Sequence, residues 1–378
     1  MKRICNFILL LCLVQLAVAQ NRIAEIRENL LGNHPDKILV VSHRADWRNA
    51  PENSLQGIQN CIDMGVDMVE IDLKKTKDGH LVVMHDKTIN RTMTGKGNAE
   101  DYTLAELKAM RLKNGAGCKT RHQIPTLEEV MLLCKGKIMV NIDKGYDYFQ
   151  EAYDVLEKTG TIDHCVIKAG LPYERVKAEN GDVLDKVIFM PIVNLHKEGA
   201  EKIINDYQSH MKPTAYELVF NDDNEEILRL IRKVRDSGAK LFINSLWPEL
   251  CGGHDDDRAV ELHQPDESWG WILNQGAKLI QTDRTALLLE YLRKKKRHDE
   301  RYSFMLKHLI IFYKVSSPGP CNVDVMSSSG KRRLKYLQWS TFLSASFGYG
   351  MYYVCRLSLN VVKKPIVDEG IFSETELG

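Results

Sequence analysis

Two histidines and two carboxylates early in the sequence are the side chains best suited to catalysis. His43, Glu70, Asp72 and His85 each stand at or just beyond the end of an apolar, strand-like run. An imidazole can take a proton from an attacking hydroxyl and give one to a leaving alcohol near neutral pH. Paired carboxylates can hold a divalent cation. These residue types suit metal-assisted ester hydrolysis, with His43 and His85 as the candidate acid and base.

A metal site is predicted around the paired carboxylates. Glu70 and Asp72 are two positions apart, which on a strand places both side chains on one face. Two like charges held together are costly unless a positive charge lies between them. Asp143, at the end of the next barrel strand, can supply a third carboxylate. No histidine and cysteine set competes, so Ca2+ or Mg2+ is favoured over Zn2+; neutralisation by neighbouring basic side chains is the alternative.

The elements that must position these side chains alternate between strand and helix. The strand-like runs are rich in Val, Ile and Leu, which is typical of strands covered on both faces. Such alternation predicts a parallel sheet with right-handed crossovers. The predicted strands are Ile38–Ser42, Met68–Leu73, Leu81–Met84, Ile138–Ile142, Cys165–Ile167, Val187–Val193, Tyr216–Phe220, Leu241–Asn244 and Leu279–Gln281. The predicted helices between and after them are Ser54–Met64, Leu127–Cys134, Tyr148–Lys158, Glu201–His210, Asn224–Asp236, Trp269–Gln275 and Ala286–Arg293.

One strand does not fit this alternation. Asp78-Gly79 separates the second and third runs, and an Asp-Gly turn folds a strand back antiparallel. Leu81–Met84 is therefore expected to be a hairpin arm, within an insertion of residues 80 to 125 that carries its own short helix, Leu104–Met110. The remaining eight units predict an α/β protein with a (β/α)8 TIM barrel, whose site lies at the carboxyl ends of the strands. An open doubly wound sheet is the alternative, but no Gly-rich loop follows the first strand.

The order and spacing of these motifs resemble the glycerophosphodiester phosphodiesterase family over residues 37 to 295. The matching elements are His43-Arg44, Pro51-Glu52-Asn53-Ser54, Glu70-Ile71-Asp72, Asp78-Gly79, Val82-Val83-Met84-His85-Asp86 and Thr282-Asp283-Arg284. The resemblance implies a TIM barrel with an insertion after its second strand. It also implies metal-dependent hydrolysis of deacylated phospholipids, such as glycerophosphocholine, to sn-glycerol 3-phosphate and an alcohol.

The resemblance also implies roles for single residues. His43 and His85 match the catalytic histidines, and the metal ligands match Glu70, Asp72 and the acid that ends the third barrel strand, Asp143. Arg44 matches the phosphate-binding arginine, although it could equally pair with Glu52 or Asp72. Glu52 matches an acid beside the site.

The chain departs from the family pattern around its third metal ligand. The family usually has Glu there and Lys two residues later, whereas this chain has Asp143 and Gly145. Lys144 or Lys168 is expected to supply the missing positive charge to the substrate. A further acidic run, Gly252 to Asp257, is interpreted as a solvated loop after the seventh barrel strand.

Composition and the first residues narrow the class of protein. A net charge of +1 gives no general attraction to nucleic acid, so any recognition of phosphate must be local. The small-molecule substrate is what the family resemblance implies. Residues 1–19 have a basic start, an apolar stretch and a small-x-small cleavage site, which predicts a signal peptide and export, with a periplasmic location. Residues 20–298 are then the barrel domain. The oligomeric state is not predicted.

The residues after the barrel have a different character. Residues 299–333 are rich in Ser, Pro and Gly and are interpreted as a disordered linker. Residues 334–378 resemble the first transmembrane segment of organophosphate:phosphate antiporters of the major facilitator superfamily, and 339–355 is long enough for a short membrane span. One span cannot form a transport path. A basic cluster at 331–333 conflicts with an exported barrel, so two joined reading frames are expected.

Three other functions remain open at this stage. A phospholipase-type phosphodiesterase acting on a phosphoinositide or sphingolipid head group would use the same two histidines. The barrel could instead be an accessory domain of an organophosphate transporter. An inactive binding barrel is the third alternative, and the intact set of histidines and carboxylates argues against it.

Overall fold

The computed structural model describes residues 22–32 and 37–298. The predicted signal peptide, the linker and the antiporter-like segment lie outside these residues. Within them, no helix has both the length and the apolar character needed to cross a membrane.

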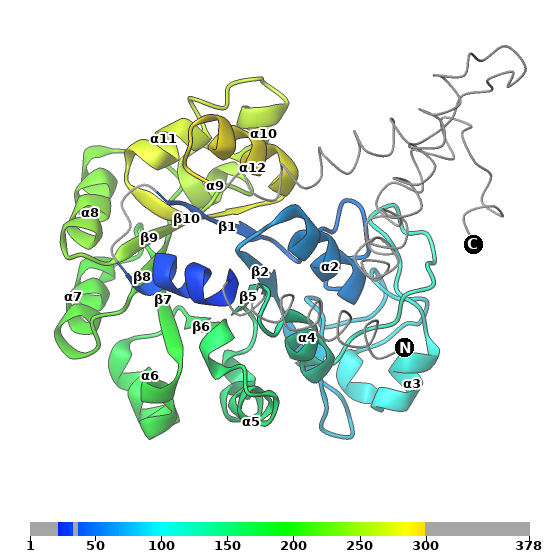
Figure 1. Cartoon of the computed structure of the whole chain (residues 1–378). Coiled ribbons are helices and arrows are strands. Elements are labelled where there is room, and N and C mark those ends of the chain that lie inside the picture. The colour runs from blue at the N-terminus through cyan, green and yellow to red at the C-terminus, as the bar shows by residue number, and fades with distance from the viewer. Residues whose placement is uncertain (1–21, 33–36, 299–378) are drawn as a thin grey trace, which may run out of the picture. The chain divides into compact units, whose positions relative to one another are not determined.

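A closed parallel barrel forms the body of the described chain, as predicted (Figure 1). Its strands lie in the order β1-β10-β9-β8-β7-β6-β5-β2 around the ring. The bounds are β1 Leu39–Ser42, β2 Met68–Ile71, β5 Met139–Ile142, β6 Cys165–Ala169, β7 Ile188–Asn194, β8 Ala215–Val219, β9 Lys240–Asn244 and β10 Ala277–Thr282. The predicted strands differ from these only by a residue or two at their ends, apart from the run that begins at Met68.

Helices surround the ring of strands and cover its outer face (Figure 1). The α-helices are α2 Leu55–Met64, α3 Leu104–Ala109, α4 Leu127–Cys134, α5 Phe149–Thr159, α6 Tyr173–Asn180, α7 Ala200–His210, α8 Glu225–Asp236, α9 Pro248–Cys251, α10 Asp256–Val260, α11 Trp269–Asn274 and α12 Thr285–Lys294. Short 3-10 segments occupy Ala99–Asp101, Tyr146–Tyr148, Ile162–His164 and Gly181–Lys186. Helix α6 was not predicted, because it buries only Val176 and therefore has no apolar stripe.

A helix of residues 22–31 closes the amino-terminal end of the barrel, where it lies across the ring of strands in dark blue in Figure 1. Its apolar side chains Ile23, Ile26 and Leu30 pack against inward-facing residues of the strands. Arg22 donates to Asp67 at 2.7 Å, which ties this helix to the start of β2. The carboxyl ends of the strands, where active sites of such barrels ordinarily lie, are at the opposite end.

A two-stranded antiparallel arm, β3 Leu73–Lys75 and β4 Leu81–Val83, leads from the barrel into the insertion. The predicted strand Met68–Leu73 is therefore divided: Leu73 belongs to the arm, and Asp72 stands at the break between β2 and β3. A small apolar core of its own stabilises the insertion. Its buried members are Val82, Met84, Ile89, Met93, Ala99, Leu107, Leu112 and Ile124.

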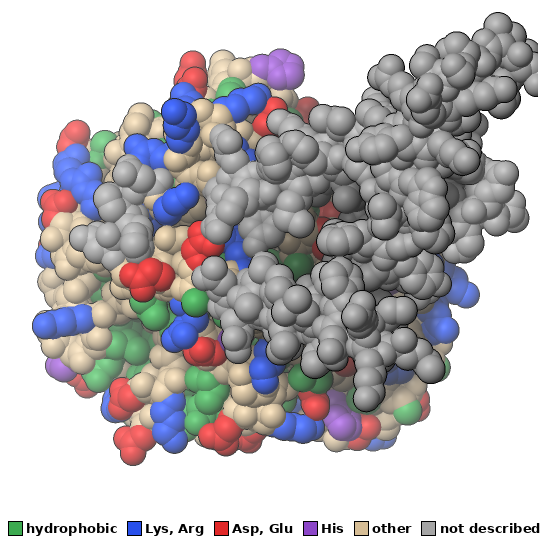
Figure 2. Space-filling model, viewed as in Figure 1, with side chains coloured by type: hydrophobic (Ala, Val, Ile, Leu, Met, Phe, Trp, Pro, Cys, Tyr) green, Lys and Arg blue, Asp and Glu red, His purple; other side chains and the backbone are tan. Residues whose placement is uncertain are grey.

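The described surface that is visible in Figure 2 carries both signs of charge. On the face shown in Figure 2, acidic and basic side chains are interspersed over the outer helices. This agrees with a net charge of +1 and gives no sign of a large electrostatic docking surface on that face.

Candidate active site

Three carboxylates meet at the carboxyl end of the barrel. Strand β2 pairs with β5 so that Glu70 lies beside Asn141, which brings Asp72 and Asp143 together just beyond the strand ends. One oxygen from each of Glu70, Asp72 and Asp143 lies within 4.8 Å of the others. Glu70 and Asp72 are buried, whereas Asp143 is partly exposed. The predicted ligands thus form one group that could hold a cation.

Among the described residues, each of the two buried carboxylates has one oxygen that accepts a hydrogen bond and one that does not. Glu70 Oε2 accepts from the backbone N–H of Arg44 at 2.8 Å, and Asp72 Oδ2 accepts from Asn53 Nδ2 at 3.0 Å. Glu70 Oε1 and Asp72 Oδ1 are buried and accept no hydrogen bond within the described residues. Burial, together with the charges of Asp72 and Asp143, raises the pKa of Glu70 well above its ordinary value. The set fits a hard divalent cation with oxygen ligands.

The loop after β1 is turned sharply to present these donors. Arg44, Ala45 and Asn53 have φ angles of 49°, 61° and 56°, in the left-handed region that Asn tolerates and Arg and Ala rarely adopt. Such strain persists where the surrounding structure fixes it, often at functional sites. Here it directs the N–H of Arg44 at Glu70. The Arg44 guanidinium lies 3.4 Å from Glu52 Oε1 and 3.8 Å from Asp72 Oδ2.

His43 is held by a carboxylate from the last barrel strand. Its Nδ1 lies 2.9 Å from Asp283 Oδ1, which also accepts from Trp47 Nε1 at 2.6 Å. Burial alone would raise the pKa of Asp283, but the contacts with His43 and Trp47 outweigh it and lower this pKa. An ionised Asp283 orients the imidazole and leaves Nε2 for chemistry. The ring of Trp247, 43% exposed, stands edge-on to His43 at 6.1 Å.

Asp283 has a support that the sequence analysis missed. Asp256 is 1% exposed and accepts from the backbone N–H of Asp283 and the side chains of Ser245, Trp269 and Thr282. The interpretation of Gly252 to Asp257 as a solvated loop is therefore wrong for Asp255 and Asp256, which are buried, whereas Asp257 is exposed. Nothing in the sequence indicated that Asp256 is buried, because an Asp in a Gly- and Asp-rich run ordinarily faces solvent.

His85 lies between an acid and a lysine. Its Nδ1 is 2.7 Å from Asp86 Oδ1, and its Nε2 is 2.6 Å from the ammonium of Lys144. Because the carboxylate accepts the Nδ1 proton, Nε2 is the ring nitrogen that accepts from Lys144. Lys144 follows Asp143 directly, so this contact brings His85 beside the carboxylate group.

Lys168 occupies the barrel interior beneath the carboxylates. It is 1% exposed, donates to Glu217 and lies 3.6 Å from Asp143 Oδ1. Burial lowers the pKa of Lys168, but the charges of Asp143, Glu217 and Glu70 outweigh burial and raise it overall. Substrate binding by Lys168 stays a prediction. Glu217, which also accepts from Asn244 at 2.7 Å, was missed, although a Glu within an apolar strand run is a recognisable signal.

A third unpredicted residue, Arg91, reaches the site from the insertion. Arg91 donates to both oxygens of Glu52 and to both oxygens of Asp86. It thereby contacts the acid beside Arg44 and the acid beside His85. No motif around Arg91 indicated this position.

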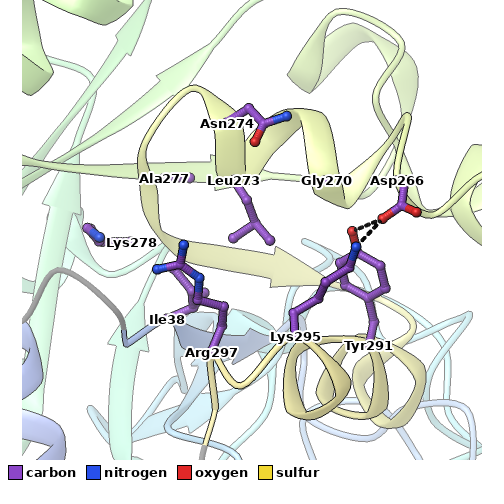
Figure 3. Close-up of a pocket in the computed structure, with 10 residues that line it drawn as sticks. All are labelled: Ile38, Asp266, Gly270, Leu273, Asn274, Ala277, Lys278, Tyr291, Lys295 and Arg297. Atoms are coloured by element: carbon purple, nitrogen blue, oxygen red, sulfur yellow. Dashed lines mark hydrogen bonds and ion pairs between the residues drawn. The ribbon is translucent and has the colours of Figure 1, made fainter.

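A cavity of about 570 Å3 lies away from this group (Figure 3). Ile38 and Ala277 line it at the amino-terminal ends of β1 and β10, and Asp266 within it contacts Tyr291 and Lys295. Because barrel chemistry occurs at the carboxyl ends of strands, the candidate active site is the carboxylate and histidine group.

The fold and the site together define a TIM barrel with a candidate acid–base and cation-binding centre at its carboxyl end. The family model DUF4996, a domain of unknown function, matches residues 189–292. The chain is 43% identical over 109 residues to a glycerophosphodiester phosphodiesterase of Caldanaerobacter subterraneus. This match covers 28% of this chain and 45% of the relative. It is 34% identical over 139 residues to one from Bacillus subtilis, covering 33% of this chain and 47% of the relative. The chain thus matches about half the length of these relatives.

Solved structures show the same barrel. A glycerophosphoryl diester phosphodiesterase from Parabacteroides distasonis covers 72% of this chain and 92% of its own, with a TM-score of 0.60 and 24% identity. An Oleispira antarctica phosphodiesterase in complex with the product sn-glycerol-3-phosphate covers 68% of this chain and 96% of its own, with a TM-score of 0.51 and 18% identity. These likenesses confirm the TIM-barrel fold.

Proposed function

We propose that the chain is a glycerophosphodiester phosphodiesterase that releases sn-glycerol 3-phosphate and an alcohol. One observation carries this proposal: two carboxylate-paired histidines each lie one residue away from a single group of three carboxylates. His43 precedes Arg44, whose N–H binds Glu70. His85 contacts Lys144, which follows Asp143. The similarity to named phosphodiesterases over part of the chain supports the same activity.

The two histidines divide the proton transfers between them. His85 accepts a hydrogen bond at Nε2 from Lys144, so this nitrogen carries a lone pair and suits the base that deprotonates the nucleophile. That nucleophile is a water, or it is the glycerol hydroxyl of the substrate; in the second case a water must afterwards open the resulting cyclic phosphodiester to give sn-glycerol 3-phosphate. To act as the acid, His43 must carry a proton on both ring nitrogens: its Nδ1–H then donates to Asp283, and its Nε2–H is given to the leaving alcohol. Arg44 binds the phosphoryl oxygens, and Lys144 approaches them when it leaves His85.

Glu70, Asp72 and Asp143 would hold one divalent cation, Ca2+ or Mg2+. A cation held there would supply positive charge to the phosphoryl oxygens of the diester. The oxygens Glu70 Oε1 and Asp72 Oδ1, buried and without hydrogen bonds in the described part of the chain, support this role.

The test is release of sn-glycerol 3-phosphate from a panel of glycerophosphodiesters, with and without a chelator. We expect turnover that the chelator abolishes and that Ca2+ or Mg2+ restores. Intact phosphoinositide and sphingolipid substrates form the second arm of the panel. Turnover of intact lipid alone would replace the proposal with the phospholipase-type alternative.

Export is proposed on the sequence of residues 1–19, and the antiporter-like character of 334–378 stays a prediction. Expression of the full chain with an epitope tag at its end, followed by fractionation and amino-terminal sequencing, tests both. Cleavage after residue 19 supports export. A cytoplasmic, uncleaved product would contradict it.

A further inference from the structure

Arg91 is the only described residue of the insertion that we find in contact with the carboxylate partners of both Arg44 and His85. Its Nε and one terminal nitrogen bind Asp86, at 2.8 and 3.0 Å. Its two terminal nitrogens bind the oxygens of Glu52, one of them at 2.8 Å. Four of the five guanidinium N–H donors are thus directed at two carboxylates. Only the planar fork of an arginine can make two such bidentate pairs at once.

Each of these carboxylates supports a different part of the site. Asp86 Oδ1 is 2.7 Å from His85 Nδ1 and sets the orientation of that ring. Glu52 Oε1 is 3.4 Å from the guanidinium of Arg44. The contact with Arg91 lowers the pKa of Asp86 and keeps it ionised. A shift of Arg91 would therefore move the proposed base and the proposed phosphate ligand together.

The insertion holds the backbone of Arg91 firmly. Arg91 lies on a turn in which the N–H of Met93 donates to the carbonyl of Ile89 at 2.8 Å. Ile89 and Met93, on either side, are both fully buried in the core of the insertion. The Arg91 side chain itself is half exposed. The buried core of the insertion therefore fixes the backbone of Arg91, and the Arg91 side chain in turn contacts the carboxylates at the site.

We propose that Arg91 is a positioning residue that fixes Asp86 and Glu52, and so aligns His85 and Arg44 for the same substrate phosphate. This inference rests on the proposed function and adds a role for the insertion. Arg91 does not touch the cation ligands Glu70, Asp72 and Asp143. Its removal should therefore lower turnover without changing cation affinity.

The test compares Arg91→Ala and Arg91→Lys with Lys96→Ala, which removes another exposed cation of the same insertion. Because small misalignments of catalytic groups cost about 100-fold in rate, R91A should lose about that much in kcat, and R91K about 10-fold, since an ammonium cannot form either fork. K96A should behave as wild type. Millimolar guanidinium should restore part of the turnover of R91A, because it can occupy the place of the missing side chain. It should not change the turnover of K96A. Ca2+ and Mg2+ affinities, measured by calorimetry, should be the same in all variants.

A kcat for R91A within twofold of K96A would overturn the inference, and so would a parallel loss of cation affinity. A separate readout does not depend on turnover: 15N spectra of histidine-labelled protein. The His85 ring signals should be sharp in wild type and K96A, and broadened or split in R91A. If the wild-type chain releases no sn-glycerol 3-phosphate, the proposed function fails. In that case the His85 signals still test the positioning role of Arg91. Unchanged signals in R91A would overturn this role, and altered signals would support it.

Discussion

Replacing Lys168 with Met should destabilise the protein, because it leaves buried carboxylates without their positive partner. Lys168 and Glu217 are 1% and 4% exposed, and the ammonium donates directly to the Glu217 carboxylate. The same ammonium lies 3.6 Å from Asp143 Oδ1. Removing one partner of a buried ion pair costs about 3–5 kcal/mol, since the other charge stays buried. For a barrel of this size the loss corresponds to a fall in Tm of about 6–20 °C.

A double variant separates the two parts of this cost. In K168M/E217Q both members of the ion pair are neutral and nearly unchanged in volume, and the amide oxygen can still accept from Asn244. We expect most of the stability lost in K168M to return. The remaining deficit arises from Glu70, Asp72 and Asp143, and saturating Ca2+ or Mg2+ should reduce it because a bound cation supplies the missing positive charge.

Thermal and urea denaturation of the wild type, K168M, E217Q and K168M/E217Q, each with and without cation, measure these differences. The reasoning is refuted if K168M is as stable as wild type. If K168M instead raises KM alone, Lys168 binds substrate as the sequence first indicated, and its burial does not prevent that role.

Three further outcomes are expected. With a glycerophosphodiester whose leaving group is p-nitrophenol, which needs no proton, His43→Ala should recover most of its lost kcat while His85→Ala should not; equal recovery in both would contradict the assignment of acid and base. Asp283→Asn should lower kcat about 100-fold or more by releasing the ring of His43, with little change in thermal stability of the fold, and a normal kcat would show that the His43–Asp283 contact is dispensable. The pKa of Glu70 is raised in the cation-free protein. Protonated Glu70 therefore contributes folding stability below the ordinary Glu pKa, and this contribution is lost as the pH rises through the raised pKa. Cation binding, in contrast, requires the ionised carboxylate. The increase in Tm on adding Ca2+ or Mg2+ should therefore be larger at about pH 8 than at about pH 5, and a shift independent of pH would contradict a site containing Glu70.

Much of the fold was predictable from local patterns. Apolar runs separated by helical periodicity gave the strands and most helices of the barrel, and Asp78-Gly79 identified the antiparallel arm. Helix α6 was missed because only Val176 on it is buried. The division of the run from Met68 at Asp72 was also missed, since the buried apolar residues Ile71 and Leu73 continue the strand pattern on both sides of Asp72.

Site residues that directly follow a barrel strand could be predicted from the sequence. Site residues whose contacts come from distant segments could not. His43, Glu70, Asp72 and Asp143 are placed by the carboxyl ends of their strands. Arg91 reaches the site only because the insertion folds back, which its own sequence does not specify. Two acids, Glu217 and Asp256, were also not predicted. Their hydrogen-bond partners come from other strands and loops, which the local sequence does not reveal.

The central claim is that one cation held by Glu70, Asp72 and Asp143 is required for cleavage of the diester. A single titration of cation-free protein with Mg2+ or Ca2+, following heat and release of sn-glycerol 3-phosphate together, tests it most directly. We predict one cation per chain, activity that rises in proportion to occupancy, and loss of both signals in Asp72→Asn. Full turnover in the presence of a chelator, or cation binding without any change in turnover, would contradict the claim.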